Sequence, residues 1–213
     1  MLSYIQITQL IERGINNMSL TIALKHKGIV YIGSDSLASR YGTKHYLTNP
    51  NNYRIFPVKG CDDMLMSLDG RILENNVARC NYLVPEAIAM KGEIDFEFMV
   101  NEFVPHLFDL FDNRHLLKHK EDDYLCESDM IVAYKDKLFQ IICDGAVVEC
   151  DDYAVIGDGV EEALGSLLTT SDITDPKERI LIALKAGLSH KTRVAYPLVI
   201  TNTETCEFET IKE

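Results

Sequence analysis

The chain has 213 residues, 46% of them hydrophobic, and a formal net charge of -12 at pH 7, a length that suits one domain with a large core. Because no cluster of Lys and Arg offsets this charge, which repels phosphate backbones and anionic lipids, we expect neither nucleic-acid nor membrane partners. No apolar run reaches the roughly eighteen residues of a membrane span, and the first residues lack the pattern of a signal peptide. We therefore expect a soluble, cytoplasmic protein.

The first predicted element is a β-hairpin that begins at Ser19, directly after Met18. Two apolar runs rich in β-branched residues flank a short turn that contains Gly28, which is a strong local hairpin signal. A small hydroxyl residue at the start and Asp35 at the exit give this hairpin the parts of a nucleophilic site. The simpler alternative is an ordinary buried hairpin with a surface Asp35.

The length of the turn decides the register of the hairpin. A two-residue turn of Lys27 and Gly28 sets Asp35 opposite Leu20, on the other face from Ser19. A three-residue loop that also includes His26, closed by a left-handed glycine, pairs Ser19 with Asp35. We favour the three-residue loop because it puts the glycine where only glycine is comfortable.

The remaining elements form two blocks of strands, each followed by a pair of helices. Extended segments are expected around residues 46–47, at 53–58 and at 63–68, then helices at 71–90, interrupted by Pro85, and at 95–112. Strands resume at 130–134, 138–142, 146–148 and 153–156. Helices at 160–168 and 176–190 precede the last strands at 198–201 and 206–211.

This order of elements predicts an α+β protein with a four-layer αββα sandwich, in which two stacked, mainly antiparallel sheets are flanked by helices. The strands are apolar on successive residues, so both faces of each sheet should be buried. No repeat, low-complexity tract or linker indicates a second domain.

The cysteines and histidines predict neither a metal site nor a bound cofactor. His115 and His119 stand one helical turn apart, but no carboxylate with zinc-site spacing accompanies them, which favours a solvated face. The cysteines show no C-x-x-C pair and lie in apolar segments, as reduced core thiols of a cytosolic protein do. They are Cys61, Cys80, Cys126, Cys143, Cys150 and Cys206.

The chain from Ser19 to Ile211 resembles the β-type subunits of the proteasome and their simpler bacterial relatives. These belong to the N-terminal nucleophile (Ntn) hydrolases, whose fold is the αββα sandwich reached above from element order. The motifs that carry the resemblance are Ser19-x-Thr21-Ile22-Ala23, Gly28-Ile29-Val30, Gly33-Ser34-Asp35, Arg54-Ile55-Phe56-Pro57-Val58 and Val155-Ile156-Gly157-Asp158-Gly159.

The resemblance implies four site residues. Ser19 falls where the family has its N-terminal threonine nucleophile, and Asp35 falls on the active-site aspartate. Arg54 falls where the family has a lysine, if three extra residues lie in the loop 42–52. Asp158 falls on a supporting serine, and a later family aspartate has no clear counterpart near Lys191.

The departures from the family pattern have chemical consequences. The base for the Ser19 hydroxyl would be the chain's own α-amine, whose unperturbed pKa is about 7.7 to 8.0. Arg54 supplies a cation that lowers the cost of forming alkoxide, but it cannot give up a proton. Serine lacks the γ-methyl that restricts the χ1 of threonine, and a nearby Asp158 would raise the pKa of the amine.

The α-amine of Ser19 is free only if residues 1–18 are absent. We therefore divide the chain into an N-terminal extension, 1–18, and one proteasome-like domain, 19–213. The extension can be a surface helix or a cleaved propeptide, although Met18 stands where self-processing relatives have glycine. We favour a third reading, that translation starts at Met18, which an aminopeptidase removes because serine follows.

The leading hypothesis is an N-terminal nucleophile hydrolase that cleaves peptide or amide bonds with Ser19, helped by Asp35 and Arg54. Two alternatives stay open: a proteasome-like ring subunit with little or no catalytic power, and a small-molecule amidase of the same fold. Family members assemble into stacked rings around proteolytic chambers. The resemblance thus implies a homo-oligomeric ring and an ATP-dependent unfoldase as partner.

Overall fold

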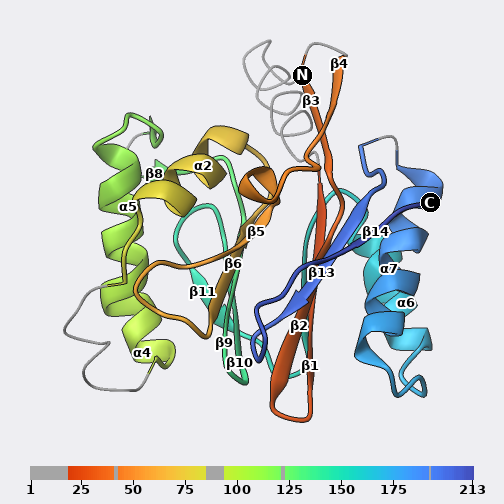
Figure 1. The fold of residues 1–213 in the computed structure, drawn as a ribbon. Coiled ribbons are helices and arrows are strands. Elements are labelled where there is room, and N and C mark those ends of the chain that lie inside the picture. Colours follow the sequence, from red (N-terminus) through yellow and green to blue (C-terminus); the bar gives the residue numbers. More distant parts are fainter. Residues whose placement is uncertain (1–18, 41–42, 85–93, 121–122, 192) are drawn as a thin grey trace, which may run out of the picture.

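The computed structural model describes residues 19–40, 43–84, 94–120, 123–191 and 193–213 (Figure 1). The N-terminal extension therefore lies outside the described residues. Within these ranges no helix combines the length and the apolar composition that crossing a bilayer requires.

Two five-stranded antiparallel sheets form the centre of the fold, as the sequence predicted (Figure 1). In the first sheet the order is β12, β1, β2, β13, β14, and in the second it is β11, β10, β9, β6, β5. The strands of the first sheet are β1 (Leu20–His26), β2 (Ile29–Ser34), β12 (Tyr153–Gly157), β13 (Leu198–Asn202) and β14 (Glu209–Ile211). Those of the second are β5 (Ile55–Pro57), β6 (Met64–Leu68), β9 (Met130–Tyr134), β10 (Lys137–Ile141) and β11 (Val147–Glu149).

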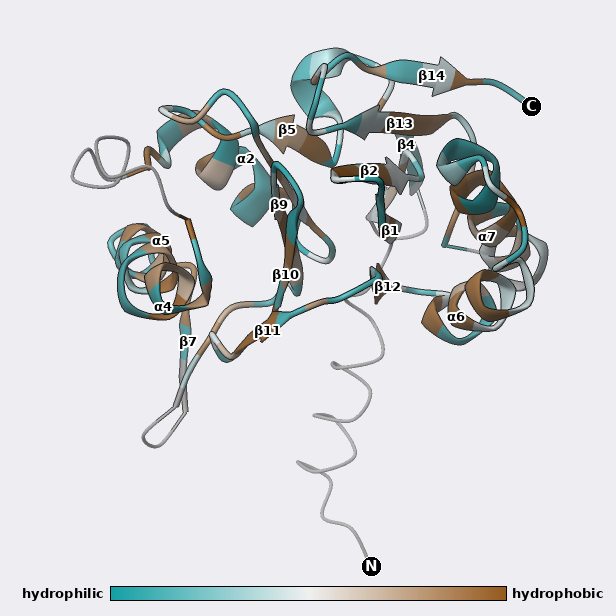
Figure 2. Cartoon of the chain, turned by 90° about the horizontal axis from the view of Figure 1, so that it is seen from below, coloured by the Kyte–Doolittle hydropathy of each residue, from teal (hydrophilic) through white to brown (hydrophobic). Residues whose placement is uncertain are grey.

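Helices cover the outer face of each sheet, which completes the four layers (Figure 2). The first sheet is covered by α6 (Val160–Thr169) and α7 (Pro176–His190), and the second by α2 (Ile72–Asn81), α4 (Phe96–Phe98) and α5 (Val104–Asp112). A π-helical segment (Met99–Phe103) joins α4 to α5, next to Pro105, which has no N–H for a helical bond. The short 3-10 helix η1 (Pro50–Asn52) precedes β5.

Three apolar clusters fill the spaces between the four layers, because successive strand residues point to opposite faces. Leu20, Ile22 and Leu24 of β1 pack against α6 and α7. The intervening Ala23 packs between the sheets with residues of β2, β6, β9 and β12. A third cluster fills the space between the second sheet and its helices. Both faces of the inner strands β1, β6 and β9 are therefore mostly buried, as expected, whereas the edge strands β11 and β14 are partly exposed.

The favoured register of the first hairpin is wrong. His26 pairs with Ile29, so the turn is the two-residue Lys27-Gly28. Both turn residues have positive φ, 50° and 81°, as a type I′ turn requires, and its twist matches that of the strands. Lys27 therefore adopts a left-handed conformation, whereas in the predicted three-residue loop only Gly28 would have done so. Asp35 consequently lies opposite Leu20 rather than Ser19.

Two further hairpins differ from the elements that the sequence predicts. The strands β3 (Leu37–Arg40) and β4 (Thr43–Tyr46) pair with each other and extend beyond the sandwich (Figure 1). The strands β7 (Lys118–Lys120) and β8 (Asp123–Leu125) pair after α5. His119 thus belongs to a strand, and His115 adopts a positive φ of 55°, so the predicted helical spacing of the two is wrong.

The cysteines are free thiols in varied surroundings. Only Cys126 is buried, whereas Cys80 is exposed and the other four are half-buried. The prediction of core thiols is therefore right for Cys126 and wrong for Cys80. The predicted helix 71–90 ends at Asn81, and its part from Pro85 onward lies outside the described residues.

Gly157, at the end of β12, provides a test of how the start of β1 is held. Its φ is 107°, and an added Cβ would lie 1.9 Å from the Ser19 carbonyl oxygen. Gly157→Ala should destabilise the fold by about 2 kcal/mol or more. Gly165→Ala, in α6 with open space around it, should instead stabilise by about 0.5 to 1 kcal/mol. Urea denaturation measures both, and a neutral Gly157→Ala would contradict the packing described here.

Candidate active site

Ser19 stands directly before β1 and is completely buried. Its carbonyl oxygen accepts a hydrogen bond of 2.6 Å from the backbone N–H of Asp158, which continues the pairing of β1 with β12. Its Oγ has no hydrogen-bond partner within the described part of the chain. A buried hydroxyl without a partner is uncommon, because desolvation costs about 1 to 3 kcal/mol.

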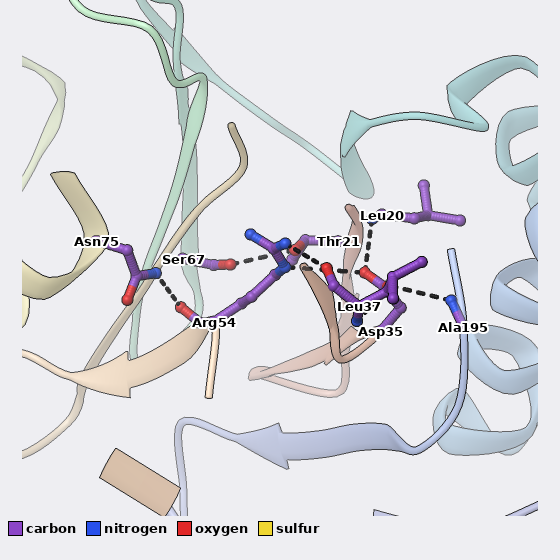
Figure 3. Close-up of polar contacts among 8 residues, drawn as sticks. All are labelled: Leu20, Thr21, Asp35, Leu37, Arg54, Ser67, Asn75 and Ala195. Carbon is purple, nitrogen blue, oxygen red and sulfur yellow. Dashed lines mark hydrogen bonds and ion pairs between the residues drawn. The ribbon is translucent and has the colours of Figure 1, made fainter. Parts of the chain in front are cut away.

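The Asp35 carboxylate follows β2 and gathers backbone groups from three segments (Figure 3). Its Oδ1 accepts from the N–H of Leu20 at 3.0 Å. Its Oδ2 accepts from the N–H groups of Leu37 at 2.9 Å and Ala195 at 3.1 Å. The Asp35 N–H in turn donates to the Leu20 carbonyl oxygen at 3.1 Å. Asp35 therefore fixes the chain that follows Ser19.

Arg54 connects the second sheet to this carboxylate (Figure 3). It lies just before β5, and its Nε is 3.9 Å from Oδ1 of Asp35 in a buried ion pair. Its Nη2 donates to the Leu37 carbonyl oxygen at 2.6 Å. Asn75 of α2 donates to the Arg54 carbonyl oxygen at 2.8 Å, which anchors the backbone of the arginine.

Asp158 contributes its backbone more than its carboxylate. The carboxylate lies 3.7 Å from Nζ of Lys191, and the same ammonium lies 3.4 Å from Glu162. Because a cation accompanies Asp158, the expected rise in the pKa of a Ser19 amine is partly offset. Lys191 was not predicted as a site residue.

The predicted residues thus meet at one peptide group, the one between Ser19 and Leu20. Asp158 binds its carbonyl oxygen and Asp35 binds its N–H, while Arg54 pairs with Asp35. This arrangement holds the backbone of Ser19 from both sides. The two-residue turn produces it, because Asp35 opposite Leu20 can reach the Leu20 N–H.

Burial dominates the electrostatics of the pair. Desolvation raises the pKa of Asp35 to about 6, although Arg54 and the three backbone N–H groups lower it. Desolvation likewise lowers the pKa of Arg54, which Asp35 and Asp69 raise. The guanidinium keeps its charge because the ordinary pKa of an arginine side chain lies far above neutral pH.

Asp69 is a charged neighbour that the sequence analysis missed. It follows β6, is fully buried, and accepts from the N–H of Asp129 at 2.9 Å through Oδ1. Desolvation first and then Asp129 raise its pKa to about 8, and Arg54 lowers it. An acidic residue followed by Gly70 at the end of an apolar run was the available signal.

The raised carboxyl pKa values predict that stability falls as pH rises. A carboxyl whose pKa is raised by folding binds its proton more tightly in the folded state, so its contribution is present below about pH 4 and is lost as pH passes the folded pKa. For Asp35 that window ends near 6 and for Asp69 near 8. Burial also raises the pKa values of Glu74 and Asp129. Denaturation midpoints should therefore drop between about pH 4 and pH 8.

Asp69→Asn is the matched control for this pH dependence. The variant should be close to the wild type in stability near pH 4, where Asp69 is neutral in the folded and the unfolded state. Its stability relative to the wild type should then rise as pH increases to about 8, because only the wild type gains free energy by ionising Asp69 on unfolding. A difference in stability that does not change with pH would be inconsistent with a buried, proton-binding Asp69.

Within the described residues, no group of three or more His, Cys, Asp or Glu side chains is placed to hold a metal ion. The groups that the described residues bring to this site are a hydroxyl, a paired cation and carboxylates. A base for the hydroxyl is the remaining requirement, which an α-amine on Ser19 would meet.

The stacked antiparallel sheets with paired helices outside have the proteasome-like N-terminal nucleophile hydrolase fold. Among solved structures, BPH from Thiobacillus denitrificans is similar, with a TM-score of 0.67, 17% identity, and coverage of 86% of this chain and 96% of that one. The same protein in complex with epoxomicin gives a TM-score of 0.62 and 16% identity over 91% and 100%. Anbu, the ancestral beta-subunit from Yersinia bercovieri, gives 0.66 and 13% over 91% and 87%.

No protein-family model and no curated protein sequence matches the chain. At identities of 13 to 17%, the likeness to these solved structures lies in the fold.

Proposed function

We propose that this protein is an N-terminal nucleophile hydrolase in which the Ser19 hydroxyl attacks a peptide or amide carbonyl. The observation that carries the proposal is the Ser19–Leu20 peptide, held at both ends by Asp158 and Asp35 beside a buried, unpartnered Oγ. A hydroxyl kept free of partners and fixed through its backbone is prepared for attack.

The roles of the other groups follow from their charges. The Ser19 α-amine acts as the base, taking the hydroxyl proton as the hydroxyl oxygen bonds to the substrate carbonyl carbon. The amine returns that proton to the leaving amine when the tetrahedral intermediate collapses to an acyl-enzyme, and a water then attacks the ester. Arg54 lowers the cost of negative charge near the hydroxyl, and Asp35 holds Arg54 in place.

The fold comparison supports this proposal at the level of substrate class. Epoxomicin is bound by BPH, whose fold this chain shares. We infer that the present site also takes a peptide, and we propose epoxomicin as its probe.

The proposal requires that residues 1–18 be absent from the working protein, leaving 19–213. The favoured route is a start at Met18 followed by its removal. The intact mass of the protein from its native host tests this route. A mass that begins at Ser19 supports it, and a persistent species that begins at Met1 would overturn it.

A chain produced with Ser19 as its first residue tests the activity itself. It should hydrolyse members of a panel of peptide amides, while the same chain preceded by residues 1–18 should not, because the α-amine is then tied up in a peptide bond. Hydrolysis of small amides without any peptide cleavage would instead favour the small-molecule amidase. Equal activity of both chains would contradict the amine as base.

A second candidate is a proteasome-like ring subunit with little catalytic power. Two properties of Arg54 favour this candidate. Its Nη2 already donates a hydrogen bond to the Leu37 carbonyl oxygen, and arginine cannot exchange a proton as a lysine can. Both candidates include a homo-oligomeric ring and an ATP-dependent unfoldase partner. Mass in solution tests the ring, because a stable monomer would remove the enclosed chamber from either candidate.

A further inference from the structure

The space between the two sheets changes from apolar to polar along its length. At one end of this space, Thr203 links the start of β2 to the β9–β10 turn. Its N–H donates to the carbonyl oxygen of Val30 in β2, and its Oγ1 donates to the carbonyl oxygen of Lys135 in the turn. Ser19 and Asp69 lie at the other ends of β1 and β6 respectively, as the strand directions require (Figure 1). They therefore share one end of the inter-sheet layer.

A hydrogen bond marks where the polar part of the layer begins. Oγ1 of Thr21 and Oγ of Ser67 are 3.2 Å apart across the two sheets (Figure 3). Because side chains alternate along a strand, Ser19 and Asp69 point into the same layer, each one pleat beyond this contact. The backbone pairing that continues through both residues supports this orientation.

Both side chains keep a buried atom unsatisfied at this end. Ser19 Oγ and Asp69 Oδ2 each lack a hydrogen-bond partner in the described part of the chain. A buried carboxyl oxygen without a partner is costly when ionised, and far less so when it carries a proton that it can donate.

One cation serves two carboxyl groups here. Arg54 lies 3.9 Å from Asp35, and the pairing of β5 with β6, in which Ile55 is opposite Ser67, sets Arg54 beside the end of β6 that Asp69 follows. All three residues are buried, and the charge of Arg54 lowers the pKa of both carboxyl groups. The other charged groups that face Asp69 are acidic: Asp129, which precedes β9, and Glu74 of α2. A single guanidinium can balance only one of the two carboxylates, so the other is stable as the neutral acid.

We propose that Asp69 is a positioning residue of the Ser19 site, which as a neutral acid leaves the whole Arg54 charge to Asp35 and the nucleophile. When Asp69 ionises, it competes for Arg54 and weakens the positive field at Ser19. This inference rests on the proposed function in its consequence for reactivity, whereas the link between Asp69 and Arg54 stands without it.

The link to Arg54 is tested by NMR, without any reaction. The Nε–H resonance of Arg54 should shift with an inflection near pH 8, the pKa of Asp69, and Asp69→Asn should remove that inflection. Asp136→Asn, an exposed residue in the β9–β10 turn, should leave it unchanged. If the resonance shows no inflection near pH 8 in the wild type, or keeps it in Asp69→Asn, the proposal is overturned.

The consequence for the site is tested by the rate at which epoxomicin labels Ser19 in the chain that begins there. The ratio of the labelling rate of the wild type to that of Asp69→Asn should fall about tenfold between about pH 7 and pH 9, as the neutral fraction of Asp69 decreases. The ratio is the measured quantity because the Ser19 α-amine titrates over the same pH range in both proteins. Asp69→Ala should be labelled more slowly than Asp69→Asn at every pH, because Arg54 is then held only from the side of Asp35.

The two tests separate the two claims. Identical pH profiles for wild type and Asp69→Asn would overturn the role of Asp69 while labelling itself persists. Absence of labelling at every pH would overturn the proposed function, and with it the role of Asp69 in positioning the Ser19 site. The NMR inflection would still report the electrostatic effect of Asp69 on Arg54.

Discussion

Ser19→Ala should abolish hydrolysis and covalent labelling and leave the fold as stable as before, or slightly more so. The loss of activity should reach at least about a thousandfold, because no other group replaces a removed nucleophile. Stability should not fall, because Oγ is buried and makes no hydrogen bond in the described structure. Its removal therefore relieves a desolvation penalty of order 1 kcal/mol.

Ser36→Ala is the matched control for that result. The Ser36 hydroxyl is also buried and unpartnered in the described part of the chain, so its removal should change stability as Ser19→Ala does and leave activity in place. Peptide hydrolysis and urea denaturation of both variants provide the comparison. A Ser19→Ala protein that keeps its activity, or that unfolds, would contradict the account of Ser19.

Arg54→Met should lower both stability and activity. The substitution leaves the Asp35 carboxylate, 1% exposed, without its cation, and breaking a buried pair from one side costs about 3 to 5 kcal/mol. It should also raise the pKa of Asp35 further, since Arg54 now lowers it. Urea denaturation at neutral pH measures the change in stability, and labelling of Ser19 measures the change in reactivity.

A double-mutant cycle separates the two effects of Arg54. Asp35→Asn in the Arg54→Met background should recover much of the lost stability, because neither charge of the pair then remains, and should not recover activity. Arg54→Lys keeps the cation and should lie between wild type and Arg54→Met in both measurements. Additive losses in the double mutant would mean that the 3.9 Å ion pair contributes nothing.

The fold was predictable where local signals agree. The sequence pattern predicts a helix at 176–190, and α7 has these bounds. Its start is fixed by Pro176 and by Asp175, whose side chain accepts from the Lys177 N–H, a pairing of residues typical of helix starts. The register of the first hairpin failed because a non-glycine residue, Lys27, occupies a left-handed position that local preference disfavours.

The site was predictable only in part, for a physical reason. Ser19, Asp35 and Asp158 lie at the ends of paired strands, so a sequence resemblance can align them. The closeness of Asp69 and Lys191 to the site depends on how two sheets and a helix end come together in space. Neither residue stands in a local pattern that predicts its partner.

Labelling of the chain that begins at Ser19 with epoxomicin, followed by peptide mapping in a mass spectrometer, tests whether Ser19 is the nucleophile. We expect one epoxomicin adduct, on the fragment that begins with Ser19, and none in Ser19→Ala. A chain with a verified Ser19 N-terminus that gains no adduct, or gains it on another fragment, would contradict Ser19 as the nucleophile.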